Sequence, residues 1–166
     1  MSRIPGRRWL AALALLSGLV ASALAQQDGQ QIQDWTVRCE QTESAGQNCL
    51  IFQTLADQDN DRPVLQISVG YPNPGAGPAA MLIVPLGVAL EPGMEIQVDE
   101  DPAFRVPFNH CNRMGCVVGF PLGPELIEAF KRGSTTRVTV SDLTGQPIGL
   151  DVSLRGFTAG FDSISR

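Results

Sequence analysis

The sequence predicts a mainly β fold, a β-sandwich of about 8–10 short antiparallel strands with one short helix near residues 124–132. Short runs in which apolar and polar side chains alternate predict half-buried strands, as in "DWTVRCE" at 34–40 and "MEIQVDED" at 94–101. Turn residues separate such runs, as in "LEPG" at 90–93. Only one segment has a helical pattern, so strands are expected to form the body of the fold.

The first part of the chain predicts three strands. Residues 34–40 and 48–57 flank the loop-like "QTESAGQ" and are expected to form a hairpin. Residues 62–72 follow as a third strand. Its apolar face is expected to consist of Leu65, Ile67 and Val69.

The second part predicts a further apolar strand at 80–87, the alternating strand at 94–101, and two more hairpins. The hairpins pair 103–111 with 115–122, and 135–143 with 148–157 around the turn "TGQP".

Residues 123–133, "GPELIEAFKRG", carry the signals of the single helix. Pro124 suits the first helical turn, and the basic Lys131 and Arg132 suit the last one. Gly133 follows as a residue that ends helices.

The first 25 residues resemble a secretory signal peptide. Basic residues, among them Arg7 and Arg8, precede a short apolar run, and Ala23-Leu24-Ala25 has the small-x-small form of a cleavage site. We therefore predict cleavage after Ala25, a flexible segment at 26–33 and a single β-sandwich domain at 34–166. A retained N-terminal anchor is the alternative, and the arginine pair leaves both general secretory and twin-arginine export open.

The charge of the chain limits its partners. The formal net charge is −5, and loss of the signal peptide, which holds three arginines and no acidic residue, lowers it by three to −8. An acidic surface disfavours nucleic acid and anionic membranes as partners. No stretch after the signal peptide is expected to span a membrane.

The four cysteines are expected to form disulfides. An even number of cysteines in an exported protein is typical of disulfide bonding, although four cysteines allow three pairings. The cost of closing loops favours the local pairs, Cys39 with Cys49 and Cys111 with Cys116.

His110 is the only histidine and precedes Cys111 in "HCNRMGC". A zinc site would need a further pair of closely spaced cysteines, which Cys39 and Cys49 do not supply. A thioredoxin-like redox site would need two residues between the cysteines, whereas four separate Cys111 from Cys116. The segment is therefore interpreted as a structural staple.

Acidic turns are weak candidates for metal binding. Asp57, Asp59 and Asp61 alternate as at the start of a calcium loop, but Arg62 and Ser68 stand where that loop needs glycine and glutamate. The 99–101 turn is also acidic. No metal and no cofactor is predicted.

The proline- and glycine-rich loop at 71–78 is the candidate binding edge, because loops at sandwich ends often carry recognition. Its candidate binding residues are Tyr71, Pro72, Asn73 and Pro74. Neither a nucleophile elbow nor a phosphate-binding glycine loop occurs in the sequence, and no catalytic residue is predicted.

Several motifs together resemble the invasion-associated locus B family of small exported bacterial proteins. They are "WTVRC" at 35–39, "VPLGVALEPG" at 84–93, "FNHCNRMGC" at 108–116, "FKRG" at 130–133 and "VSLRGFTAGFDSI" at 152–164. The resemblance implies a β-sandwich in the periplasm or at the outer membrane, and it supports structural pairing of the four cysteines. It also implies an association with entry into, or survival in, host cells, and it supplies no catalytic motif.

The sequence thus predicts an exported, non-enzymatic binding protein that supports host-cell invasion or envelope integrity. Its partner is expected to be an envelope or host-surface protein or a glycan. The alternative is a calcium-dependent carbohydrate-binding module or a periplasmic hydrolase that uses the clustered aspartates.

Overall fold

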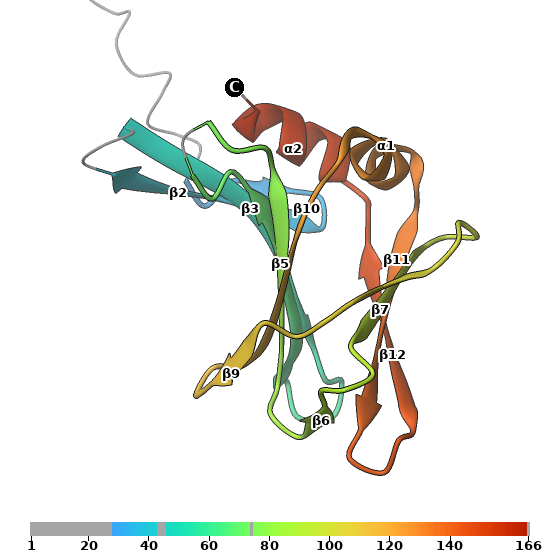
Figure 1. The fold of residues 1–166 in the computed structure, drawn as a ribbon. Helices are drawn as coiled ribbons and strands as arrows, with labels where there is room; N and C mark the ends of the chain where they lie inside the picture. Colours follow the sequence, from blue (N-terminus) through green and yellow to red (C-terminus); the bar gives the residue numbers. More distant parts are fainter. Residues whose placement is uncertain (1–27, 43–45, 74, 166) are drawn as a thin grey trace, which may run out of the picture.

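The computed structural model describes residues 28–42, 46–73 and 75–165, which form two antiparallel β-sheets and two helices (Figure 1). The predicted signal peptide and its cleavage site lie outside the described residues. Among the described helices, none is long and apolar enough to cross a membrane.

The larger sheet has seven strands, and every neighbouring pair in it is antiparallel. In spatial order they are β1 (Gln31–Ile32), β2 (Trp35–Thr42), β3 (Gly46–Ala56), β4 (Pro63–Gly70), β5 (Ala79–Val84), β10 (Gly115–Pro121) and β9 (His110–Asn112). The expectation of a flexible segment at 26–33 fails for β1, which pairs with Thr36 and Trp35 of β2.

The smaller sheet has five strands. They are β12 (Pro147–Ser153), β11 (Thr135–Asp142), β7 (Met94–Val98), β8 (Phe104–Val106) and the two-residue β6 (Val88–Ala89), which pairs with the end of β11. The mainly β prediction is confirmed, although the very short β1, β6, β8 and β9 raise the number of strands above the expected range.

The predicted strand at 103–111 is wrong in one respect, because it belongs to two sheets. Its first part, β8, pairs with β7 in the smaller sheet, and its last part, β9, pairs with β10 in the larger one. Pro107 lies between them and lacks the N–H that a continuous ladder needs, so the chain crosses from one sheet to the other there.

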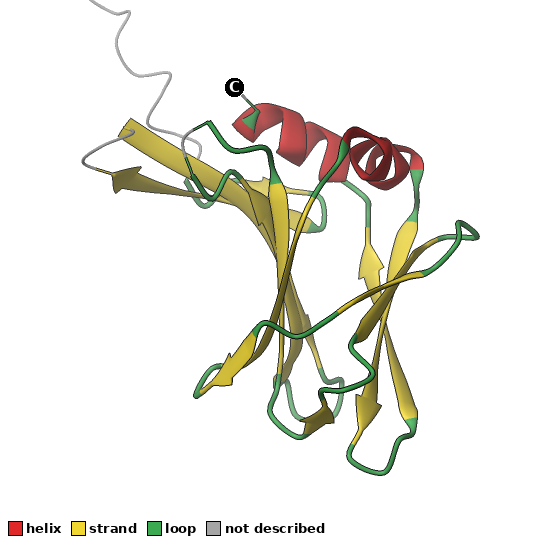
Figure 2. Ribbon diagram, viewed as in Figure 1, coloured by secondary structure: helices red, strands yellow, loops and turns green. Residues whose placement is uncertain are grey.

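The predicted helix is confirmed as α1 (Pro124–Arg132). The prediction of a single helix is wrong, because a second one, α2 (Phe157–Ile164), begins at the last residue of the strand expected at 148–157. β12 ends at Ser153, and Gly156 adopts a left-handed conformation with φ of 88° just before α2. That conformation stops the extended chain and favours glycine. Figure 2 shows the two helices at one end of the sheets, where Lys131 Nζ lies 2.8 Å from Asp162 Oδ1.

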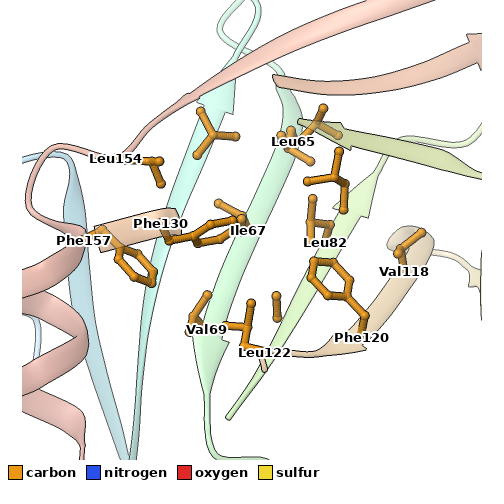
Figure 3. Close-up of a cluster of buried hydrophobic side chains, with 14 of the residues drawn as sticks. Leu65, Ile67, Val69, Leu82, Val118, Phe120, Leu122, Phe130, Leu154 and Phe157 are labelled. Atoms are coloured by element: carbon orange, nitrogen blue, oxygen red, sulfur yellow. The ribbon is translucent and has the colours of Figure 1, made fainter. Parts of the chain in front are cut away.

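The core lies between the two sheets and beneath the helices. Leu65, Ile67 and Val69 of β4 are buried as predicted, and side chains from α1 and α2 point into the same interior (Figure 3). Phe157 of α2 meets Trp35 and Phe130 edge to face, with ring centroids 5.3 and 5.2 Å apart. A helix of eight residues is not stable by itself in water, and these tertiary contacts therefore explain why α2 forms.

Polar bonds also join the two sheets at the end of β12. Trp35 Nε1 donates to the Ser153 carbonyl at 3.0 Å, and Gln53 Nε2 donates to the same carbonyl at 3.1 Å. Ser153 Oγ lies 2.6 Å from Asp34 Oδ2. These contacts fix the position at which the chain leaves β12 for α2.

A candidate binding loop between two apolar recesses

The cysteine pairs form as predicted. A disulfide joins Cys39 of β2 to Cys49 of β3, and another joins Cys111 of β9 to Cys116 of β10. In each case the two residues are directly opposite in the antiparallel register. Because all four thiols are consumed, "HCNRMGC" holds a staple at the edge of the larger sheet, and His110 is exposed beside it.

The acidic turns serve the fold. Asp57 Oδ1 accepts a hydrogen bond from the Asp59 N–H at 2.9 Å, which closes the turn between β3 and β4. Asp99 accepts from the N–H groups of Ser134 and Thr135, each at 2.9 Å, and Asp101 pairs with Arg132.

The two acidic turns do not combine into one site. The Asp99 turn lies on the side of α1, whereas the β3–β4 turn lies at the other end of the sheets (Figure 1). Within the described ranges, no three His, Cys, Asp or Glu side chains are grouped so that they could hold a metal ion. Asp57, Asp59 and Asp61 therefore do not form a joint calcium or hydrolase site with the 99–101 turn, as the alternative had required.

The 71–78 loop connects β4 to β5, and its first residue is anchored. Tyr71 is half-buried and stacks on Phe161 of α2 with ring centroids 6.3 Å apart, while its hydroxyl lies 3.3 Å from Ser165 Oγ. The structure therefore assigns Tyr71 to holding the loop. Pro72 and Asn73 are exposed, and Pro74 lies outside the described residues.

The other end of the loop is also fixed to the sheet. The Leu122 N–H donates to the Pro78 carbonyl at 2.9 Å, which ties the loop to the chain after β10. Within the loop, the Ala76 N–H donates to the Asn73 carbonyl at 3.1 Å. The exposed tip is therefore carried by a base that is held on both sides.

A recess of about 210 Å³ lies on one side of this loop, on the outer face of the larger sheet. Its walls come from β3, β4, β5 and the start of the loop: Asn48, Cys49, Leu50, Ser68, Gly70, Tyr71, Pro72, Ala79, Ala80 and Met81. Gly70 leaves the floor open, because a Cβ there would lie 2.8 Å from Leu50 Cβ. Met81 is 44% exposed at the rim.

A second recess of about 440 Å³ lies on the other side of the loop. It is lined by Pro72, Ala76, Gly77, Pro78, Ala79, Gly119, Phe120, Pro121, Leu122 and Gly123. Pro72 and Ala79 line both recesses, so the loop forms the ridge between them. Their apolar and backbone-rich walls suit the apolar side chains of a partner.

The sequence reasoning found the loop but missed the recess residues of β3, β5 and β10. Alternation along 62–72 placed Ser68 on the outer face, yet it did not show which strands lie beside it. The pairing of Gly70 with Leu50 and of Ser68 with Met81 builds the recess, and this register depends on the whole sheet.

Lys131 of α1 lies beside the aromatic anchor of the loop. Its Nζ lies 5.6 Å from the centroid of the Phe161 ring, on which Tyr71 stacks. The hydrogen bond to Asp162 is the main reason that the pKa of Lys131 is raised, so the ammonium group stays charged at neutral pH. The lysine thus adds a fixed charge beside the aromatic anchor of the loop.

Comparison with known proteins supports one family. The chain is 29% identical over 134 residues to an invasion protein B homolog of Brucella abortus (strain 2308), covering 80% of this chain and 76% of the relative. A homolog from Brucella abortus biovar 1 (strain 9-941) gives the same values. The crystal structure of invasion associated protein b from Bartonella henselae shares the fold, with a TM-score of 0.73 at 21% identity, covering 81% of this chain and 92% of that one. The model of the invasion associated locus B protein family matches residues 35–165, and the chain therefore belongs to this family.

Proposed function

We propose that this protein is an exported, non-catalytic binding protein of the bacterial periplasm or outer envelope, and that it supports host-cell invasion or envelope integrity. The names of the Brucella and Bartonella relatives support the link to invasion. Two disulfides support export, because such bonds persist in oxidising compartments. The predicted signal peptide supports the same route.

The observation that carries the binding role is the loop at 71–78 between two apolar recesses, where Pro72, Asn73 and residues 75–77 are exposed. Tyr71 fixes one end of the loop on α2, and the Pro78 carbonyl fixes the other end near β10. A ridge held in this way loses little conformational freedom when a partner binds. Loops presented by a rigid sandwich are common recognition surfaces.

We infer that the partner is an envelope or host-surface protein that inserts apolar side chains on either side of the ridge. Burying one Val, Leu or Phe side chain contributes roughly 1.5–3 kcal/mol. Two such contacts, one per recess, would supply a large part of the affinity of a transient complex. A glycan remains the competing ligand class, and it would favour polar and aromatic contacts over aliphatic ones.

Photo-crosslinking from the loop tests this proposal. A photoreactive amino acid at Asn73 should give a discrete adduct in envelope extracts or on host cells, and the same probe at Met114 is the control. Met114 is 80% exposed on the β9–β10 turn, away from the recesses. Identical adducts from both positions, or none from Asn73, would argue against the loop as a binding edge.

A matched pair of substitutions tests the recess itself. Met81→Glu places a charge at the rim of the smaller recess, whereas Met114→Glu adds the same charge elsewhere. We expect only Met81→Glu to abolish the Asn73 adduct. Enrichment of oligosaccharides in place of a protein adduct would shift the assignment to glycan binding.

The mass of the protein recovered from the periplasm tests export. Loss of residues 1–25 and a mass four hydrogens below that of the reduced chain are expected, since two disulfides form. An intact N-terminus would indicate a retained anchor.

A further inference from the structure

A second exposed apolar surface lies at the end of the sandwich opposite the 71–78 loop. The two surfaces are at opposite ends of β4, since this strand runs from Pro63 to Gly70. Five large apolar side chains are exposed at the second end. Met114 (80% exposed) lies on the β9–β10 turn, and we refer to the other four as the leucine patch: Leu86 (61% exposed), Leu90 (47%), Leu143 (76%) and Ile148 (43%). Contiguous exposed apolar groups on a folded protein commonly mark a binding surface.

Strand pairing brings the members of the patch together. Val88 and Ala89 of β6 pair with Asp142 and Ser141 at the end of β11, so Leu86 and Leu90, which flank β6, lie beside the β11–β12 turn. Leu143 stands at the start of that turn, and Ile148 follows it in register with Val140. The lower end of Figure 1 shows β6 and this turn together.

Acidic groups surround the patch. Glu91 follows Leu90, and Asp142 precedes Leu143. The β3–β4 turn with Asp57, Asp59 and Asp61 lies at the same end, because Gln66 pairs with Ile83 and the start of β4 therefore lies beside the end of β5. Two basic residues lie in the described turns at this end, Arg62 on the β3–β4 turn and Arg113 on the β9–β10 turn, and they are outnumbered by the carboxylates.

The other basic side chains lie elsewhere, and most are already paired. Arg105 pairs with Glu95, Lys131 with Asp162, Arg132 with Asp101, and Arg137 with Asp151. The negative charge at the patch is therefore local as well as part of the net charge of the chain. Charges within a Debye length of about 8 Å act on a bound partner at physiological salt.

Exposed leucines beside carboxylates favour one kind of binding partner. A second copy would bring the same carboxylates against this end, and an anionic membrane would also meet like charge. A protein segment with an apolar face flanked by lysine or arginine satisfies both the leucines and the carboxylates. We propose that the leucine patch docks a basic amphipathic segment of a partner protein, at a site separate from the 71–78 loop.

A synthetic amphipathic helix of about five turns, with leucine on one face and lysine on the other, serves as the probe. Fluorescence anisotropy with the exported protein should show saturable binding that weakens as NaCl is raised. The matched peptide with glutamate in place of lysine should not bind, and a lysine peptide with serine in place of leucine should bind weakly.

Variants locate the site. Leu86→Ser with Leu143→Ser should weaken binding of the Leu/Lys peptide by about tenfold or more, the effect of losing one leucine contact. Asp59→Lys with Glu91→Lys should weaken it further, whereas Glu100→Lys on the β7–β8 turn and Met81→Ser on the outer face of β5 are the controls for charge and for an exposed apolar residue. Met81→Glu should leave peptide binding unchanged, which separates this test from that of the proposed function.

Three results would overturn the proposal. One is an equal loss of binding in the patch and control variants. Another is that the glutamate peptide binds as well as the lysine peptide, or that the protein floats with phosphatidylglycerol vesicles. Either result would show that the patch does not require a positively charged partner. The third is a dimer in solution that Leu143→Ser dissociates, because the patch would then be covered by a second copy.

Discussion

Tyr71 stacks on Phe161 with an interplanar angle of 24°, and Phe161 in turn stacks on the buried Phe157 at 5.6 Å. This row of rings connects the base of the 71–78 loop to the core. The candidate binding loop therefore depends on the C-terminal helix α2, although the two are far apart in the sequence.

Replacement of Tyr71 should measure this anchor. Tyr71→Ala removes a stacked pair and part of its buried surface, and we expect a loss of about 1–2 kcal/mol of unfolding free energy in urea denaturation. Tyr71→Phe keeps the stack and should cost less than about 1 kcal/mol. Asn73→Ala is the exposed control, and an equal loss there would show that Tyr71 has no special role.

Gly156 should resist substitution more than another left-handed glycine. Gly156 and Gly145 have φ of 88° and 85°, but a Cβ at Gly156 would collide with the Ile32 carbonyl, whereas Gly145 has open space around it. Gly145→Ala should therefore cost about 1–2 kcal/mol from conformation alone, and Gly156→Ala should cost clearly more. Thermal unfolding of the two variants makes the comparison, and equal losses would contradict a close approach of β1 to α2.

Each disulfide should stabilise the fold by lowering the conformational entropy of the unfolded chain. Their sequence separations are 10 and 5 residues, for which chain entropy gives about 2–3 kcal/mol each. Cys39→Ala with Cys49→Ala, and Cys111→Ala with Cys116→Ala, should each lower the unfolding free energy by about that amount. Adding reductant to the wild type should lower the unfolding free energy by the sum of both losses. A variant with the same urea midpoint as the wild type would show that the disulfide it lacks does not stabilise the fold.

Asp142 should make the β11–β12 turn pH-dependent. Hydrogen bonds from the Thr144 hydroxyl and from the Gln146, Thr144 and Gly145 N–H groups lower the pKa of its carboxyl. A lowered pKa in the folded state means that the carboxylate stabilises the fold above the ordinary Asp value of about 3.9 and loses this effect as pH falls through the folded value.

The comparison of wild type with Asp142→Asn tests this sign. The wild type should be more stable than the variant at neutral pH, and the difference should shrink as pH falls below about 4. Unfolding curves collected across this range provide the measurement. A difference that stays constant with pH would mean that the charge of Asp142 does not act on the turn.

Local patterns were sufficient for a large part of this fold. Alternation identified Leu65, Ile67 and Val69 as the buried face of β4, because side chains of a strand point to opposite faces in turn. Pro124, Lys131 and Gly133 identified α1, because proline starts and glycine ends helices through their backbone geometry. The short loops between Cys39 and Cys49, and between Cys111 and Cys116, favoured the observed pairs.

Other features needed long-range contacts. The run 148–157 has strand-like alternation up to Ser153, yet α2 forms because Phe157 can pack against Trp35 and Phe130. The run 103–111 looks continuous, but Pro107 lets it serve two sheets. Tyr71 was expected to face a ligand, whereas Phe161 occupies one side of its ring.

The sequence by itself determined the β content, the first helix, the disulfide pairs, the family resemblance and the place of the candidate loop. These depend on side-chain periodicity, on local loop length or on motif order, which are properties of neighbouring residues. Only the tertiary structure decided the second helix, the strand that changes sheets, the separation of the acidic turns and the two apolar surfaces at opposite ends of β4. Each of these depends on which distant strands pair and in what register, and local preferences do not encode that choice.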